Sequence, residues 1–152
     1  MARPAPAPLA GLGPDGLEPC TALMVRRLAR RITQIYDEAL TPYGLTVGQV
    51  SLLAALRRSR GIGIGALAGH LSADASTVSR LLRPLESAGL LVLEPDPEDR
   101  RGKHVRLTNA GFETRGRAIA GWRAAQDQVR ASLGDGRLSA LRFLLDDAHA
   151  HL

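Results

Sequence analysis

Serine, threonine and arginine side chains gather between residues 72 and 88, and these residue types can bond to phosphates and to base edges. On a helical wheel of about 100° per residue, the apolar residues of this segment cluster on one side and small and basic residues lie opposite. Small residues let the backbone approach a base edge, and arginine forms paired hydrogen bonds with guanine or phosphate. The candidate contacts are Ser76, Thr77, Ser79, Arg80 and Arg83. The alternative is an ordinary amphipathic surface helix with two solvated arginines.

A charged turn follows, between two β-like apolar runs. It holds the further candidate contacts Asp99, Arg100, Arg101, Lys103 and His104. Its cations could enter the minor groove of DNA or hold a phosphate, and Asp99 could fix one arginine through an ion pair. A solvated polar turn is the alternative. Because the basic turn directly follows the candidate recognition helix, we interpret the two segments together as a DNA-reading surface.

Helices are predicted on the N-terminal side of this surface. The first covers about residues 20–41 and ends at a Pro-x-Gly sequence. Thr46 and Gln49 form a capping box, which opens a second helix that runs to about Arg58. The residues of the second helix expected to face the core are Val50, Leu53 and Ala54. A short helix over 64–70 and the turn after it complete a helix-turn-helix.

The candidate recognition helix is predicted to begin at Ser72 as its N-cap and to close at Gly89. Pro84 removes a hydrogen bond inside it and should loosen its last turn. Its buried face is expected to hold Val78, Leu81, Leu82 and Leu85. Strands over 90–94 and 104–107 would then form a hairpin.

Two more helices are predicted after the hairpin. Thr108 caps a long helix that runs to about Leu133, and a last helix covers about 138–148. The long helix is expected to bury Phe112, Ile119, Trp122 and Val129. The predicted fold class is therefore mainly α with a small β-hairpin wing, a winged helix-turn-helix with additional N- and C-terminal helices.

The composition fits one domain with a polyanionic partner. Lys and Arg number 20 against 15 Asp and Glu, a net charge of +5, and hydrophobic residues make up 45%. Residues 1–18 are rich in Pro, Ala and Gly and are predicted to be a flexible tail, and 19–152 a single domain. The single cysteine, Cys20, excludes an internal disulfide framework. With neither a signal peptide nor a membrane-spanning apolar run in view, we expect a cytoplasmic protein without a membrane partner.

No catalytic or metal-binding pattern is found. The chain lacks G-x-S-x-G, a P-loop, a dinucleotide fingerprint and Cys-x-x-Cys, so we predict no enzyme activity, no catalytic residue and no cofactor. His149 and His151 lie near Asp146 and Asp147 without a coherent ligand set, which favours solvated tail residues over a metal site. Cys20 could be reactive at a helix start, but a small residue near a frayed terminus is the favoured interpretation.

Several motifs recur in the order of a known family. They are Tyr43-Gly-Leu-Thr46, Ser76-Thr-Val-Ser-Arg80, Leu85-Glu-x-x-Gly-Leu90, Asp99-Arg-Arg101 and Leu107-Thr-x-x-Gly111. With this spacing, about residues 20 to 150 resemble the MarR family of bacterial transcriptional regulators.

The resemblance implies a winged-helix homodimer. About residues 46–108 would bind DNA, and helices over about 20–41 and 108–150 would form the dimer. The helix from Ser72 would enter the major groove, and Asp99 would orient Arg101 in the minor groove. Such proteins usually repress genes and release DNA when a small molecule, often phenolic or drug-like, binds near the junction of the dimer and DNA-binding parts. The sequence does not identify the effector-binding residues.

The two-fold symmetry of a dimer predicts an inverted-repeat operator in double-stranded DNA. The alternatives are a redox-responsive regulator acting through Cys20, a winged helix used only for protein interaction, and a small-molecule enzyme. Bare arginines at the wing tip, where a protein interface would favour aromatics, argue against the interaction module. The missing nucleophile, base and metal set argues against the enzyme.

Overall fold

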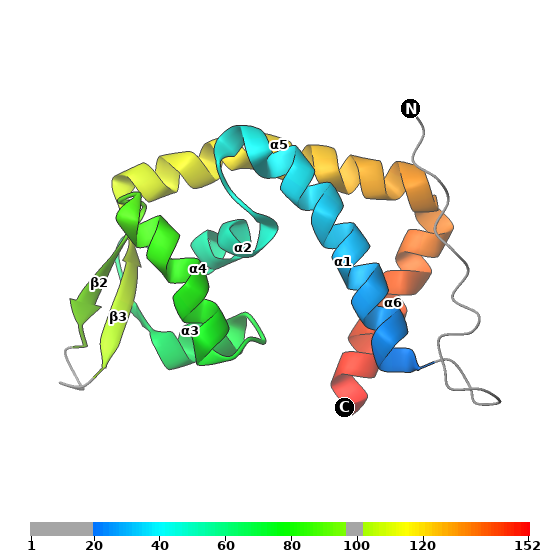
Figure 1. The fold of residues 1–152 in the computed structure, drawn as a ribbon, viewed down its shortest axis with the longest axis horizontal. Coiled ribbons are helices and arrows are strands. Elements are labelled where there is room, and N and C mark those ends of the chain that lie inside the picture. The colour runs from blue at the N-terminus through cyan, green and yellow to red at the C-terminus, as the bar shows by residue number, and fades with distance from the viewer. Residues whose placement is uncertain (1–19, 97–101) are drawn as a thin grey trace.

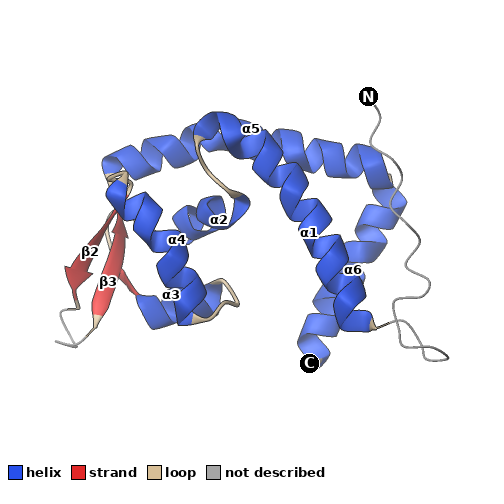
Figure 2. Cartoon of the chain, viewed as in Figure 1, coloured by secondary structure: helices blue, strands red, loops and turns tan. Residues whose placement is uncertain are grey.

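The computed structural model describes residues 20–96 and 102–152. The predicted tail over 1–18 and the wing residues Asp99, Arg100 and Arg101 lie outside the described residues. The elements, in chain order, are α1 (Thr21–Leu40), the 3-10 turn η1 (Thr41–Tyr43), α2 (Val47–Ala55), β1 (Ile62–Gly63), α3 (Ile64–His70), α4 (Ala75–Ser87), β2 (Leu91–Pro95), β3 (Lys103–Leu107), α5 (Asn109–Leu133) and α6 (Asp135–His151). The mainly helical fold with a small β wing is confirmed (Figure 2).

The long helix α5 spans the molecule and joins its two ends (Figure 1). The sheet and α2 to α4 lie on the side of its N-terminal half, and α1 packs across it. After Gly134, whose φ of 74° is left-handed, the chain turns into α6, which contacts α5. The DNA-binding candidates therefore lie at one end of the molecule, and the outer parts of α1 and α6 lie at the other end.

The sheet has three antiparallel strands in the order β1-β3-β2, one more than the predicted hairpin. β2 pairs with β3 from Leu91 opposite Leu107 to Pro95 opposite Lys103. The two-residue strand β1 adds to the other edge, where Ile62 faces Val105. This edge strand ties the connection before α3 to the base of the wing.

The core joins the helix-turn-helix to the wing. Its largest fully buried side chains are Leu40, Leu52, Leu53, Leu56, Leu67, Leu85, Leu91, Leu107, Val78 and Val105. The predicted inward face of α4 is confirmed at Val78, Leu82 and Leu85, and Leu81 is partly buried. Packing of this face leaves the opposite side of α4 in solvent.

The second helix differs from its prediction in two ways. The capping box between Thr46 and Gln49 is present, but α2 ends at Ala55 and not near Arg58, because Leu56 turns into an extended conformation and is fully buried. Ala54 is exposed, so its predicted inward orientation is wrong, whereas the neighbouring Leu52 faces the core.

The predicted buried face of α5 is wrong at three of its four positions. Phe112, Ile119 and Trp122 are 42%, 45% and 40% exposed, and only Val129 is buried. The residues that α5 buries are mostly small: Gly111, Ala118, Gly121, Ala125 and Val129. Small residues allow the wing base and α1 to approach the helix backbone, which turns the bulky side chains outward. α6 is also longer than predicted, because it begins directly after Gly134 and extends to His151.

Candidate nucleic-acid interface and adjoining pocket

Asp74, and not Ser72, is the N-cap of α4. Ser72 has a left-handed φ of 46°, and the Asp74 carboxylate accepts hydrogen bonds from the Thr77 amide at 2.8 Å, the Thr77 hydroxyl at 2.9 Å and the Ser76 hydroxyl at 2.5 Å. These donors, the Ser76 hydroxyl above all, hold the pKa of Asp74 far below its usual range. The first turn of α4 is thus fixed by a charged cap.

The hydroxyl candidates are occupied within the helix. The single hydroxyl protons of Ser76 and Thr77 are donated to Asp74, and Ser79 donates to the carbonyl of Ala75 at 2.8 Å. In this arrangement the oxygens of these side chains can still accept, but their protons are not available to DNA. The sequence alone placed these residues on the outer face but did not show that their hydroxyl protons form hydrogen bonds within the helix.

The two arginine candidates on α4 are both exposed, and they differ in freedom. Arg80 folds along the helix, where its Nη2 lies 3.0 Å from the Ser76 hydroxyl and its Nε 3.3 Å from the Ser76 carbonyl. For Arg83, no hydrogen bond or ion pair is seen to any residue in the described part of the chain. Arg83 is therefore the cation on α4 most free to bind a ligand.

The C-terminal end of α4 is closed by a Schellman motif. Gly89, with φ 68°, donates to the Glu86 carbonyl at 2.8 Å, and Leu90 donates to the Leu85 carbonyl at 2.9 Å. Pro84 lies inside the helix, which continues to Ser87. The predicted glycine stop is confirmed, and it leads the chain directly into the wing.

Cross-strand pairs hold the wing. Arg106 on β3 pairs with Glu94 on β2, which lowers the pKa of the Glu94 carboxyl through the hydrogen bonds from that guanidinium. The Nε2 of His104 lies 3.0 Å from Asp96 Oδ2, so this candidate contact is engaged inside the wing. Lys103 is exposed at the end of β3, next to the turn that lies outside the described residues.

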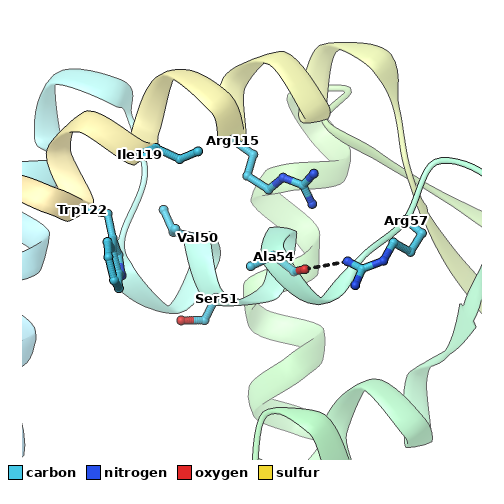
Figure 3. A pocket seen from close by; sticks show the side chains of 7 residues that line it. All are labelled: Val50, Ser51, Ala54, Arg57, Arg115, Ile119 and Trp122. Carbon is cyan, nitrogen blue, oxygen red and sulfur yellow. Dashed lines mark hydrogen bonds between the residues drawn. The ribbon is translucent and has the colours of Figure 1, made fainter.

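A pocket of about 480 Å³ lies between α2 and α5. The family resemblance implied an effector site near the junction of the dimer and DNA-binding parts, but the sequence did not identify the residues that line it. Figure 3 shows its lining: Val50, Ser51, Ala54, Arg57, Arg115, Ile119 and Trp122. We call it the roof pocket, because α5 forms its roof. The pocket explains why Ala54, Ile119 and Trp122 are exposed where the sequence predicted burial, since their side chains face this cavity and not the core.

Arg115 forms the charged wall of the roof pocket. Its Nη1 donates to the carbonyls of Leu53 at 3.0 Å and Leu56 at 3.3 Å, which bind the open end of α2 to α5. Burial, together with the nearby charges of Arg57 and Arg58, lowers the pKa of its guanidinium. Two guanidiniums and no carboxylate line this pocket, so it suits an anion with an apolar body.

The remaining sequence candidates lie away from these sites. Cys20 is exposed before the first turn of α1. His151 Nδ1 lies 2.8 Å from the Asp147 carbonyl, and no group of three metal-ligating side chains exists among the residues that the structure describes. Nor does any described helix have the length and apolarity to cross a membrane.

Comparison with known proteins identifies the family. The model of the MarR family matches residues 45–103. The transcriptional repressor NicR of Pseudomonas putida is 30% identical over 142 residues, which cover 93% of this chain and 89% of NicR. The chain belongs to the MarR family.

Two solved structures of transcriptional regulators bound to DNA resemble this chain. The transcriptional regulator MosR of M. tuberculosis in complex with DNA is 33% identical, has a TM-score of 0.71, and the match covers 87% of this chain and 97% of MosR. The repressor CouR bound to a 23-mer duplex is 26% identical with a TM-score of 0.74, over 86% of this chain and 92% of CouR. As a MarR family member, the chain is a DNA-binding transcriptional regulator and not an enzyme.

Proposed function

We propose that this MarR family protein is a dimeric repressor that binds an inverted-repeat operator and leaves it when a small molecule fills the roof pocket. The observation that carries the DNA-binding part is the two-sided α4 helix. Its apolar face is buried at Val78, Leu82 and Leu85, while Arg80 and Arg83 project into solvent from the opposite side. The name of NicR and the MosR complex with DNA support the same interpretation.

On this proposal the contacts divide into base readers and phosphate binders. Arg83, and Arg80 once it leaves Ser76, would reach guanine edges in the major groove. Ser76, Thr77 and Ser79 would accept hydrogen bonds or lie close to the backbone. From the wing, Lys103 would bind phosphate and His104 would support the turn. By resemblance to the family, Asp99 would orient Arg101 in the minor groove beside Arg100.

Exposed apolar side chains on α1 and α6 support a homodimer. The largest exposed fractions among them are 68% for Phe143, 61% for Leu144 and 51% for Val25. Apolar surface of this extent at one end of a chain favours burial against a second copy. A two-fold dimer would place its two α4 helices on half-sites about 10 bp apart or at a multiple of that spacing.

The chemistry of the roof pocket supports a phenolic or aromatic acid as effector. Trp122 and Ile119 offer apolar contact, and Arg57 and Arg115 offer donors to a carboxylate or phenolate. Because the pocket lies between α2 and α5, an occupant that fits only one spacing of these helices would shift the population of DNA-binding conformations. We place the regulator in the cytoplasm, where bacterial DNA is accessible.

Fluorescence anisotropy with the DNA that flanks its own gene, measured at two salt concentrations, tests the regulator proposal. We expect sequence-specific binding that weakens steeply with salt. Arg101→Ala should weaken binding while the dimer persists in sedimentation. Equal affinity for operator and unrelated DNA, or a monomer that binds as well as the dimer, would contradict the proposal.

A thermal-shift screen of phenolic acids tests the effector part, because a ligand of the folded state raises its melting temperature. Trp122→Ala should remove the response and leave DNA affinity unchanged. A ligand that releases DNA equally well from this variant would place the effector elsewhere.

A further inference from the structure

Three guanidiniums gather at the base of the wing, where the end of α2 meets the first turns of α5. Arg58 and Arg115 lie on the ring of Phe112, with their Cζ atoms 4.3 Å and 5.1 Å from its centroid. Arg57 joins them in a hollow of about 370 Å³ that also includes Asn109. We call this the wing-base hollow. Arg58, Asn109 and Phe112 line it without lining the roof pocket.

Every partner seen for these three arginines is neutral. Arg57 donates to the carbonyl of Ala54 at 3.1 Å, and Arg58 donates to the side-chain oxygen of Asn109 at 3.3 Å. Arg115 donates to two backbone carbonyls. Over residues 20–96 and 102–152, no carboxylate forms an ion pair with any of the three.

Such a cluster has unused binding capacity. Each guanidinium carries five N–H donors, and only one nitrogen of each is engaged in the bonds described above. Three like charges repel one another, and a ligand with two negative charges would both neutralise them and accept from several donors. Charge-assisted bonds of this kind are the strong ones in proteins, particularly when arginine pairs with phosphate or carboxylate.

We propose that the wing-base hollow binds a compact dianion, a phosphoryl group or a dicarboxylate, between the guanidiniums of Arg58 and Arg115. This site would be additional to the DNA contacts. It shares Arg57 and Arg115 with the roof pocket and differs from it by Arg58, Asn109 and Phe112, and it does not require the function proposed for that pocket. Arg57 would close the side toward α2.

Its position favours a free small anion over the phosphate backbone of DNA. The carbonyl of Arg57 accepts from the amide of Leu107 at 3.1 Å, so the cluster lies at the base end of β3. Lys103, at the turn end of the same strand, is four residues away, a distance of about 13 Å at the usual strand rise. In Figure 1, β2 leads away from α5 and β3 leads back toward it, so the Leu107 end of β3 is the end nearer α5.

A bound dianion would join three parts of the fold. The Arg57–Arg58 segment follows α2, Arg115 belongs to α5, and the Arg57 carbonyl is bonded to β3. A ligand held by all three parts binds the folded state alone, so it should raise the melting temperature in a saturable way.

Thermal shift and calorimetric titration of the full chain test the proposal, with inorganic phosphate, pyrophosphate and malonate as probes at constant ionic strength set by chloride. We expect a saturable rise in melting temperature and one site per chain. A preference for phosphate over malonate, or the reverse, identifies which dianion the site takes. No response beyond that of chloride would overturn the proposal.

Two variants locate the site. Arg58→Gln should weaken the dianion at least tenfold, and it retains a donor for Asn109. Arg117→Gln is the matched control, because Arg117 lies two positions further along α5 than Arg115, on another face, and donates to Thr114. Equal weakening in both variants, or none in Arg58→Gln, would overturn the proposal. A shallower salt dependence of DNA binding in Arg58→Gln without dianion binding would instead assign the cluster to DNA.

Trp122→Ala separates this site from the proposed effector pocket. The variant should lose the response to phenolic acids and keep the response to the dianion. Loss of the dianion response in Trp122→Ala would show that one pocket accounts for both ligands and would refute a separate wing-base site.

Discussion

Gly111 allows α5 to touch the base of the wing, and Gly111→Ala should destabilise the protein although alanine favours helices. A methyl group built at this position would lie 1.9 Å from the Leu90 carbonyl oxygen and 2.8 Å from a methyl carbon of Leu107. The first of these neighbours is backbone and cannot rotate away. The start of α5 or the β2 end of the wing would have to move.

The expected loss combines three effects. Overpacking a rigid site costs about 1–3 kcal/mol. The Leu90 carbonyl also accepts from the Thr108 amide at 3.2 Å, and weakening that bond costs about 1 kcal/mol more. The higher helix propensity of alanine offsets up to about 1 kcal/mol of this loss. The net loss is about 2 kcal/mol, which lowers the melting temperature of a domain of this size by roughly 4–8 °C.

Chemical and thermal denaturation at one fixed protein concentration would measure this loss. Gly116→Ala is the matched control on the same helix, because nothing lies within 4 Å of a Cβ there. The control should be stabilised by about 0.5–1 kcal/mol. A Gly111→Ala variant as stable as Gly116→Ala would refute the close contact between α5 and the wing.

Three further outcomes are expected. Pro84→Ala restores a donor to the Arg80 carbonyl inside α4 and should raise the free energy of unfolding by about 1–3 kcal/mol in urea; a lower value would mean that the helix end requires proline. Asp74→Ala should be less stable than the parent protein at neutral pH. Since the folded pKa of Asp74 is depressed, this difference should shrink once the pH falls below the ordinary aspartate value of about 3.9 and disappear below the folded pKa; a difference that stays constant to the acid limit of folding would contradict the cap. Lys103→Ala should reduce the salt slope of DNA binding by about one, and an unchanged slope would mean that Lys103 binds no phosphate.

Local signals in the sequence predicted much of the fold. The capping box at Thr46, the glycine stop at Gly89 and the Thr108 cap depend on neighbouring residues alone, and all three are present. Ser72 was predicted as the cap of α4, and that prediction was wrong. Asp74 is the cap because the hydroxyls of Ser76 and Thr77 also donate to its carboxylate. The preference of a residue type for the cap position does not take such additional hydrogen bonds into account.

Features that depend on distant residues were not predictable from periodicity. A helical wheel assigns bulky apolar residues to the core, yet α5 buries its glycines and alanines because other elements approach it closely, and Trp122 faces a pocket. The arginine cluster joins Arg57 and Arg115, which come together only when α2 packs against α5. The strand β1 has two residues, too few to show an alternating pattern.

We propose that α4 reads DNA sequence through its exposed arginines. Competition binding of the parent protein and Arg83→Ala to an operator series, in which each base pair is changed in turn, tests it most directly. We expect the variant to lose about 1–3 kcal/mol of discrimination at one base pair in each half-site and to keep it at the others. Unchanged discrimination at every base pair would contradict the assignment of α4 as the recognition helix.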